Sequence, residues 1–520
     1  MTKQQPGKET DNQDKMERSG LVAKMKGLGV GQTTRVRSTR AAGQSKKRAT
    51  DDGKGKKPQK RAKTVALAQD TPLNQIPQEI LNIYVFGGGS SGELGLGPVP
   101  TDAVKDPTLV VRPVFNQLLS QSRIVQVSVG GIHCAALTAD GQIITWGAND
   151  SNTLGRSSVW SPDENAEDDD EPELNPLEAT PAMVPHENFV DAPADIRFVQ
   201  VVATDNATFA LTEHGEVWGW GTFRGNNGAF GFLKSMIRDV SDPEDPSTEE
   251  LVAVRPVRIP GLPPKIKALV GASNHILVLT HSGDVYGWGA GTQNELGRRF
   301  GSLKTEARFN SLEPQHLATP KNKIVKVFAG YHHSFAINGD GEVWAWGLNN
   351  YGQTGIPVTR GQRSGMGTIS VIAPTKVKAL KGYKIVCVAA GLHHSIACAE
   401  DGTVLAWGRC DDGQMGIDLS TVSGDVVYRD SRGRPTELSV PTVVPDLSAK
   451  LVAAGIDCCF AITDEGHAYS WGFSSDFRTG LGTDDTVERP KRIGKAVKDK
   501  VVNWVGCGGA FAVLAGPIDE

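Results

Sequence analysis

Short runs of alternating apolar and polar residues recur along the chain, separated by turn residues. The fullest copy, IVKVFAGYHHSFAINGDGEVWAWGLNNYGQTG at residues 324–355, breaks at Ala-Gly, at Asp-Gly and after Trp-Gly. Asp-Gly is typical of a tight hairpin, because the turn needs a positive φ that glycine adopts without steric cost. Each copy is therefore predicted to be a small antiparallel meander.

One spacing identifies the repeats. A turn glycine is followed five residues later by Trp-Gly in six places, namely Gly141 with Trp146, Gly215 with Trp220, Gly283 with Trp288, Gly341 with Trp346, Gly402 with Trp407 and Gly466 with Trp471. A related segment, YVFGGG, contains Gly87, and the mean period is about 64 residues.

The two ends of the chain supply two halves of one more unit. The last copy, VGCGGAFAVLAG from Val505, has no Trp-Gly half, and YVFGGGSSGELGLG from Tyr84 has no first half before it. A blade shared between the termini removes the free sheet edges that an open array would leave. The sequence therefore predicts an all-β fold over residues 76–520: a seven-bladed β-propeller closed by a shared N- and C-terminal blade.

Residues 1–75 form a different kind of segment. They lack strand or helix periodicity and carry 12 Lys and 6 Arg against 7 acidic residues, so we predict a disordered basic tail. Its net charge of +11, against −4 for the whole chain, leaves −15 for residues 76–520. This asymmetry indicates a basic arm for nucleic acid or for an import receptor.

Two basic clusters in the tail, about ten residues apart, resemble a bipartite nuclear localisation signal. They consist of Lys46, Lys47, Arg48, Lys56, Lys57, Lys60, Arg61 and Lys63. The alternative is a solubilising tail, which such charge runs often form.

Several functional classes lack their sequence signals. The chain has no GxxxxGK[ST], no HExxH and no nucleophile motif, so we expect no covalent catalysis, no cofactor and no metal. No apolar run approaches the length of a membrane span, and we expect no membrane partner. The seven cysteines are odd in number and mostly lie in apolar strand patterns, which fits free thiols in a reducing compartment.

The recurring histidines and an acidic segment are interpreted as structural features. Histidines recur eight residues before the turn glycine in four blades, and we interpret them as groups that satisfy buried backbone at strand ends: His133, His275, His333 and His394. Residues 157–196 contain no Lys or Arg and carry the run EDDDEPE at 167–173, so we predict an exposed acidic insertion between blades.

One rim of the predicted propeller is the functional candidate. In an up-down-up meander, the first turn of each unit and the loop after Trp-Gly lie at the same end. After Trp220 that loop is GTFRGNNGAFGF, with paired asparagines, an arginine and aromatics predicted to be exposed. In the same repeat the first turn changes to Thr204-Asp205, and Ala207 replaces the usual histidine. Because binding residues concentrate on loops of rigid scaffolds, these departures mark a site.

The repeats over residues 83–515 resemble those of the regulator of chromosome condensation family. FRGNNGAFG at 223–231 looks like the wedge of the founding member of that family. The resemblance implies guanine nucleotide exchange on the GTPase Ran, on chromatin in the nucleus, in support of nucleocytoplasmic transport and mitosis. It implies a Ran-binding set of Asp205, Arg224, Gly225, Asn226, Asn227, Gly228, Ala229, Phe230, Asn274, His393 and His394. Asn274 departs from the family pattern, which has Asp there.

The resemblance also implies docking on the nucleosome, with the tail on DNA phosphates and the loop 298–311 on the acidic surface of the histones. The residues implied are Arg298, Arg299, Lys304 and Arg308, and a plain solvated loop is the alternative. The rival function is a propeller used as an interaction scaffold, which would share the repeats but lack the wedge. An enzymatic propeller ranks third.

Overall fold

The computed structural model describes residues 72–161, 174–225, 228–237, 251–298, 309–321, 323–359 and 368–518. The chain divides into two units, 1–67 and 68–520. The first unit lies wholly outside the described residues, as do residues 1–71 of the predicted disordered tail, including the localisation signal.

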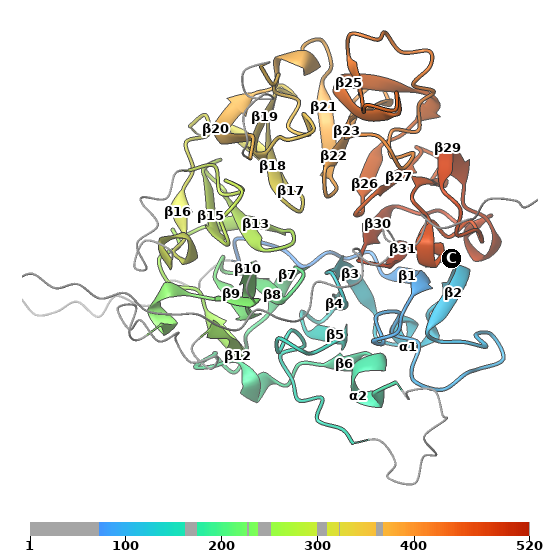
Figure 1. Ribbon diagram of the computed structural model, residues 1–520. Helices are drawn as coiled ribbons and strands as arrows, with labels where there is room; N and C mark the ends of the chain where they lie inside the picture. The colour runs from blue at the N-terminus through green and yellow to red at the C-terminus, as the bar shows by residue number, and fades with distance from the viewer. Residues whose placement is uncertain are drawn as a thin grey trace, which may run out of the picture. The chain divides into compact units, whose positions relative to one another are not determined.

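The second unit is a seven-bladed β-propeller, as predicted (Figure 1). Blade 1 combines both ends of the chain, and the other blades follow in chain order. From the inside outward, blade 1 consists of β30 (Trp504–Cys507), β31 (Phe511–Pro517), β1 (Leu81–Gly88) and β2 (Leu109–Phe115). Blade 2 consists of β3 (Ile124–Val129), β4 (His133–Thr138), β5 (Ile143–Gly147) and β6 (Ala182–Met183). Blade 3 consists of β7 (Phe198–Ala203), β8 (Ala207–Thr212), β9 (Val217–Gly221) and β12 (Ala253–Arg258), and blade 4 of β13 (Ile266–Gly271), β14 (His275–Thr280), β15 (Val285–Gly289) and β16 (Gln315–His316).

Blade 6 has a fifth strand, and a separate hairpin follows β9. Blade 5 consists of β17 (Ile324–Ala329), β18 (His333–Asn338), β19 (Val343–Leu348) and β20 (Ser370–Lys376). Blade 6 consists of β21 (Ile385–Ala390), β22 (His394–Ala399), β23 (Thr403–Arg409), β25 (Pro435–Ser448) and β24 (Val427–Arg429). Blade 7 consists of β26 (Leu451–Ala454), β27 (Cys458–Ile462), β28 (Ala468–Gly472) and β29 (Val487–Arg492). The hairpin is formed by β10 (Phe223–Gly225) and β11 (Gly228–Gly231).

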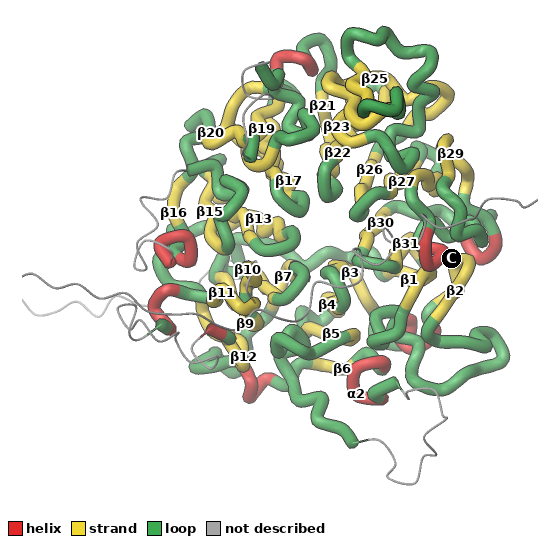
Figure 2. The backbone as a smooth tube through the Cα atoms, in the orientation of Figure 1, coloured by secondary structure: helices red, strands yellow, loops and turns green. Residues whose placement is uncertain are grey.

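The helices are short pieces between strands, drawn in red in Figure 2. Among the described residues they are α1 (Gln117–Ser120), α2 (Pro176–Ala179), η1 (His186–Asn188), η2 (Lys234–Met236), η3 (Phe309–Leu312), η4 (Lys378–Leu380), η5 (Ser475–Phe477) and η6 (Lys495–Val497). None of these helices has the length and apolar character that crossing a membrane requires.

Blade 1 closes the ring by pairing β1 with β31, and Figure 1 shows the blue and red ends of the chain side by side. The antiparallel register runs from Leu81 opposite Pro517 to Gly87 opposite Phe511. At Gly87 (φ +105°) an added Cβ would lie 2.5 Å from the carbonyl oxygen of Ala510. The glycine of every Trp-Gly meets the neighbouring turn in the same way, and this close approach explains why glycine recurs there.

Buried tryptophans connect neighbouring blades. In five of the six Trp-Gly pairs, the indole Nε1 donates a hydrogen bond of 2.6–2.9 Å to a carbonyl oxygen in the loop of the preceding blade: Trp146 to Glu93, Trp220 to Thr153, Trp346 to Glu295, Trp407 to Gln353 and Trp471 to Gln414. Trp288 differs, because its buried Nε1 has no partner among the described residues. We call these contacts indole ties.

The four recurring histidines also connect blades, which corrects their interpretation as ligands of the backbone. Each Nε2 contacts a hydroxyl or thiol of the next blade at 2.7–3.2 Å: His133 with Thr208, His275 with Ser334, His333 with Ser395 and His394 with Cys459. The partner follows the equivalent position of the next blade by one residue, a relation that a single repeat does not reveal. Burial lowers the pKa of His133, His275 and His394 to about 3, so these rings stay neutral.

The segment 157–196 is only partly an insertion, contrary to the prediction. Its C-terminal part supplies β6, which pairs with β5 at Ile144 opposite Met183. Phe189 is 6% exposed and its ring centroid lies 5.9 Å from that of Trp218. This part of the segment therefore completes blade 2 and packs against blade 3. The acidic residues around it give no strand pattern, so β6 was not predicted. The run 167–173 lies outside the described residues.

The described chain begins on the propeller. Backbone N–H groups of Leu73 and Asn74 donate to Glu213, and Asn74 Nδ2 donates to the carbonyl oxygen of Ile266 at 2.9 Å. Ile76 is 8% exposed and belongs to the same apolar cluster as Phe198. The last residues of the predicted tail therefore contact blades 3 and 4, whereas the boundary at 75/76 stays a prediction.

The indole ties predict unequal costs for the same substitution. Trp407→Phe removes a buried hydrogen bond, whereas Trp288→Phe removes an indole N–H that has no partner to lose. Both changes remove similar volume, so Trp407→Phe should lower the free energy of unfolding by about 1–2 kcal/mol more. Thermal and urea denaturation of the two variants measure the difference, and equal losses would show that the tie contributes nothing.

Candidate functional site

The predicted rim is present and its loops are joined by backbone hydrogen bonds. The residue after each Trp-Gly donates its N–H to the first turn of the same blade, as Thr222 does to Asn206 and Arg409 to His393. First turns also contact each other around the centre, as where Asp205 N–H donates to the carbonyl oxygen of Ser273 at 3.1 Å. We use rim for these first turns and the loops after Trp-Gly.

The first turn of blade 3 is closed by a side chain at a position where blade 4 has Ala272 and the other five blades have glycine. Thr204 Oγ1 lies 3.1 Å from both the N–H and the carbonyl oxygen of Ala207. The hydroxyl therefore satisfies both backbone groups and holds the turn that presents Asp205.

Asp205 lies between the first turns of blades 2 and 4. Its Oδ2 accepts a hydrogen bond from Ser273 Oγ, and an added Cβ at Gly131 would lie 3.0 Å from its Oδ1. Burial raises the pKa of Asp205 above its ordinary value, while the hydrogen bond from Ser273 and the nearby His332 act in the opposite direction. A side chain at position 131 would therefore crowd this carboxylate and require it to shift.

Strands β10 and β11 form a two-stranded sheet separate from the sheets of the blades, and we call this hairpin the wedge hairpin. Arg224 pairs with Ala229 and Gly225 with Gly228. Arg224 is exposed, while Ala229 and Phe230 are half-buried and pack against the apolar cluster of blade 3. The tip residues Asn226 and Asn227 lie outside the described residues.

The aromatic residues at the base of the wedge hairpin are buried, contrary to the prediction that they are exposed. Phe223 and Phe232 are 0% exposed and stack on Phe209, with ring centroids 5.9 and 5.5 Å away. Phe209 in turn meets Trp288 edge to face. Burial of this aromatic cluster attaches the hairpin to blades 3 and 4.

A polar contact ties the wedge hairpin to the next blade. The backbone N–H of Arg224 donates to Asn274 Oδ1 at 2.6 Å, and Asn274 Nδ2 donates to Ser273 Oγ at 2.9 Å. Asp205, Asn274 and the hairpin, which the sequence placed in one site, are thus connected in a single network.

The two adjacent histidines of blade 6 have different surroundings. His394 is 0% exposed and contacts Cys459, whereas His393 is half-buried, with its ring centroid 5.2 Å from that of Tyr351 and 6.4 Å from that of His332. Burial lowers the pKa of His393 to about 4, helped by His332 and Arg409. A neutral His393 is therefore the member of the pair that a partner can touch.

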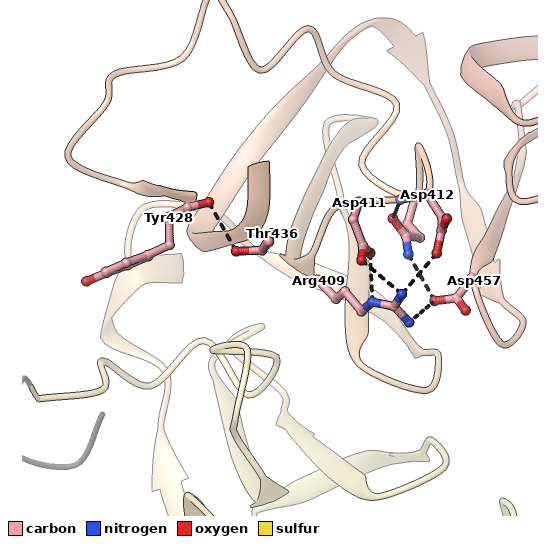
Figure 3. Close-up of polar contacts among 7 residues, drawn as sticks. Arg409, Asp411, Asp412, Tyr428, Thr436 and Asp457 are labelled. Atoms are coloured by element: carbon pink, nitrogen blue, oxygen red, sulfur yellow. Dashed lines mark hydrogen bonds and ion pairs between the residues drawn. The ribbon is translucent and has the colours of Figure 1, made fainter. Parts of the chain in front are cut away.

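Sequence reasoning missed a charged cluster beside His393. Figure 3 shows the Arg409 guanidinium between three carboxylates, with Nε 2.7 Å from Asp411, Nη2 3.1 Å from Asp412 and Nη1 3.5 Å from Asp457. One cation against three anions leaves this part of the rim negative. The signal was WGRCDDGQ, where the equivalent loop of blade 5 has WGLNNYGQ.

Figure 3 also shows the base of the extra hairpin of blade 6, where Thr436 Oγ1 donates to the carbonyl oxygen of Tyr428 at 3.3 Å. β24 pairs with β25 from Val427 opposite Leu438 to Arg429 opposite Pro435. The hairpin extends the blade at the Arg409 end of β23, because Arg409 pairs with Glu437.

Of the implied histone-binding residues, only Arg298 is described. Its Nη2 donates to the carbonyl oxygen of Glu313 at 3.1 Å and to that of Gly287 at 3.4 Å, and burial lowers its pKa to about 10. The guanidinium therefore connects β15 of blade 4 to the segment just before β16. Arg299, Lys304 and Arg308 lie outside the described residues.

The described residues include every cysteine of the chain. All seven cysteines are free, five of them buried. Within the described ranges, no group of three or more His, Cys, Asp or Glu is arranged to hold a metal ion.

Comparison with known proteins identifies the family. The model of the RCC1-like domain matches residues 82–514. The chain belongs to the RCC1-like domain family. This family member is 38% identical to protein pim1 of Schizosaccharomyces pombe over 89% of this chain and 81% of pim1. It is 34% identical to guanine nucleotide exchange factor SRM1 of Saccharomyces cerevisiae over 84% of this chain and 87% of SRM1.

Two solved structures are similar to this RCC1-like domain. One is Prp20p of Saccharomyces cerevisiae, described with its binding to Gsp1p and histones, with TM-score 0.72 and 32% identity over 86% of this chain and 94% of that chain. The other is yeast RCC1 (Prp20) bound to Kap60, with TM-score 0.73 and 32% identity over 91% of this chain and 97% of that chain.

Asp205 makes the stability of the domain depend on pH. Its folded-state pKa is raised, so its contribution is present below the unfolded-state pKa and is lost as pH rises through the folded-state value. Asp205→Asn keeps an acceptor for Ser273 without the buried charge. Its melting temperature should therefore exceed that of the wild type most at pH 8, with the difference shrinking as pH falls. Asp464→Asn, at an exposed turn, is the control, and a pH-independent difference for Asp205→Asn would contradict the assignment.

Proposed function

We propose that this protein is a guanine nucleotide exchange factor for the GTPase Ran, associated with chromatin in the nucleus and supporting nucleocytoplasmic transport and mitosis. The observation that carries the proposal is the wedge hairpin, connected through Asn274 and Ser273 to Asp205 on the rim of a closed propeller. The name of SRM1 and the Gsp1p-binding of Prp20p support the same activity.

The activity needs no covalent chemistry. An exchange factor weakens nucleotide binding by binding the nucleotide-free GTPase more tightly than the loaded one, and linkage makes this weakening reciprocal. Each 1.4 kcal/mol of differential binding changes nucleotide affinity about tenfold. The excess of carboxylates around Arg409, on a propeller of net negative charge, suits a basic surface on the GTPase.

Each predicted site residue has a role in the proposal. Arg224 through Phe230 press against the nucleotide-binding region of Ran, and Asp205, Asn274 and His393 contact Ran or hold the groups that do. Because His394 is buried in its contact with Cys459, it positions the turn that carries His393. The interface is then a broad rim with the wedge hairpin as its anchor.

Chromatin and import contacts complete the proposal. The basic tail binds DNA phosphates and an import receptor, and the histone-binding of Prp20p and the Kap60 complex of yeast RCC1 support these partners. Arg299, Lys304 and Arg308 are the candidates for the histone surface, while Arg298 holds blade 4. A scaffold without exchange activity is the alternative, and nucleotide release separates the two.

Exchange activity and stability should separate at the rim. Asp205→Ala, or replacement of Asn226 and Asn227 by alanine, should slow release of labelled guanine nucleotide from purified Ran by about tenfold or more. Asp205→Ala should change the free energy of unfolding much less than the exchange rate, because the lost hydrogen bond from Ser273 is offset by removal of a buried carboxylate. Asp140→Ala, in an exposed hairpin turn, is the control. Wild-type rates in both site variants would refute this use of the rim.

The tail should serve binding and import, not exchange. Deletion of residues 1–71 should leave release from soluble Ran nearly unchanged while weakening DNA binding and nuclear import. The DNA binding of the full chain should fall steeply with added salt, because the contacts are to phosphates. Extending the deletion through Ile76 should lower the melting temperature, because Ile76 is buried in the core. Full nuclear retention without the tail would contradict this division.

A further inference from the structure

The junction between blades 3 and 4 lacks both the indole tie and the histidine contact. In the described residues the junction between blades 7 and 1 lacks them too, where Cys458, Ala512 and Phe86 occupy the positions of the histidine, its partner and the tryptophan. Blade 3 has Ala207 where four blades have the tie-forming histidine, and blade 4 has Ile276 where others place the hydroxyl or thiol. The indole of Trp288 has no partner in the described residues, because the loop that would offer its carbonyl is replaced by the wedge hairpin. Apolar stacking of Phe209 and Phe223 fills this junction instead.

Away from the rim, the Gln200 side chain exchanges two hydrogen bonds with the backbone of Leu269, at 2.8 and 2.9 Å. At the rim, polar contact across this junction passes through Ser273. The residue is 6% exposed and lies in the first turn of blade 4. Its carbonyl oxygen accepts the N–H of Asp205, and its hydroxyl meets both the Asp205 carboxylate and the Asn274 amide. One small side chain thus joins two turns and, through Asn274, the wedge hairpin.

The direction of these hydrogen bonds follows from the number of protons available. An ionised carboxylate only accepts, so the single proton of the Ser273 hydroxyl points to Asp205. The lone pairs of that oxygen then accept from Asn274 Nδ2, which turns Asn274 Oδ1 toward the N–H of Arg224. The charge on Asp205 thereby sets the orientation of the amide that holds the first strand of the wedge hairpin.

We propose that Ser273 is a positioning residue for nucleotide exchange, which relays the orientation set by Asp205 through Asn274 to the backbone of the wedge hairpin at Arg224. The inference rests on the proposed function and assigns part of the effect of Asp205 to the geometry of the hairpin. A polar tie is needed here because the aromatic cluster is non-directional: it buries the base of the hairpin but leaves its orientation to hydrogen bonds.

Four variants test the relay in the full-length protein. Ser273→Ala removes the hydroxyl, Ser273→Thr restores it, and Asn274→Ala breaks the next link. Ser470→Ala is the matched control, because Ser470 is also buried and donates one hydrogen bond, to the carbonyl oxygen of Thr479 in blade 7. Release of labelled nucleotide is measured over a range of Ran concentrations to separate kcat from KM.

Ser273→Ala and Asn274→Ala should lower kcat about tenfold while KM changes less than threefold, since the hairpin binds but is misplaced. Ser273→Thr should recover most of kcat, and Ser470→Ala should keep wild-type kcat. Asp205→Ala combined with Ser273→Ala should be no worse than Asp205→Ala alone, because both act through one path. Wild-type kcat in Ser273→Ala, or multiplying effects in the double variant, would overturn the relay.

Amide hydrogen exchange of the free protein gives a readout that does not need Ran. Exchange at Phe223–Gly225 should speed up in Ser273→Ala and Asn274→Ala but not in Ser470→Ala. Unchanged protection of this strand would overturn the relay. If Ser273→Ala also lowers the melting temperature, faster exchange in that variant could reflect general destabilisation, and the comparison then depends on Asn274→Ala, which breaks the same path. Failure of the wild-type protein to release nucleotide from Ran would refute the proposed function and leave this structural test intact.

Discussion

The antiparallel pairing of β1 with β31 is the constraint on which the rest of the structure depends. It joins residues more than 400 positions apart and completes the blade that closes an open row of sheets into a ring. The entropic cost of closing so long a loop grows only with the logarithm of its length, and a complete set of strand hydrogen bonds offsets it. Only after closure do the first turns of all seven blades face one centre and form a rim.

Within the ring, two kinds of polar tie connect most neighbouring blades, and one of the two junctions that lack them lies beneath the wedge hairpin. Indole ties and histidine ties use buried donors and acceptors in fixed geometry, which makes neighbouring blades rigid. Between blades 3 and 4 both ties are replaced by stacked aromatics beneath the wedge hairpin. At this junction the inter-blade contacts and the loop after Trp-Gly are both changed, and the same junction carries the candidate site.

Sequence reasoning located the site but misjudged some of its side chains. Phe223 and Phe232 looked exposed because they flank a polar loop, yet they are buried since Phe209 and Trp288 of two different blades meet there. The strand β6 was overlooked because it has only two residues within an acidic segment. Arg409 was missed although WGRCDDGQ departs from its neighbours, because its three carboxylate partners come from two different blades.

The sequence by itself determined the repeat, the number of blades, the shared closing blade and the rim on which the exceptional turn and loop lie. These follow from local rules: alternation makes strands, glycine makes turns, and the period counts the units. Only the tertiary structure decided which groups meet across blades, such as Ser273 with Asp205 and His333 with Ser395. Those contacts join residues about one blade apart, where register and packing set the distance, and no local pattern encodes them.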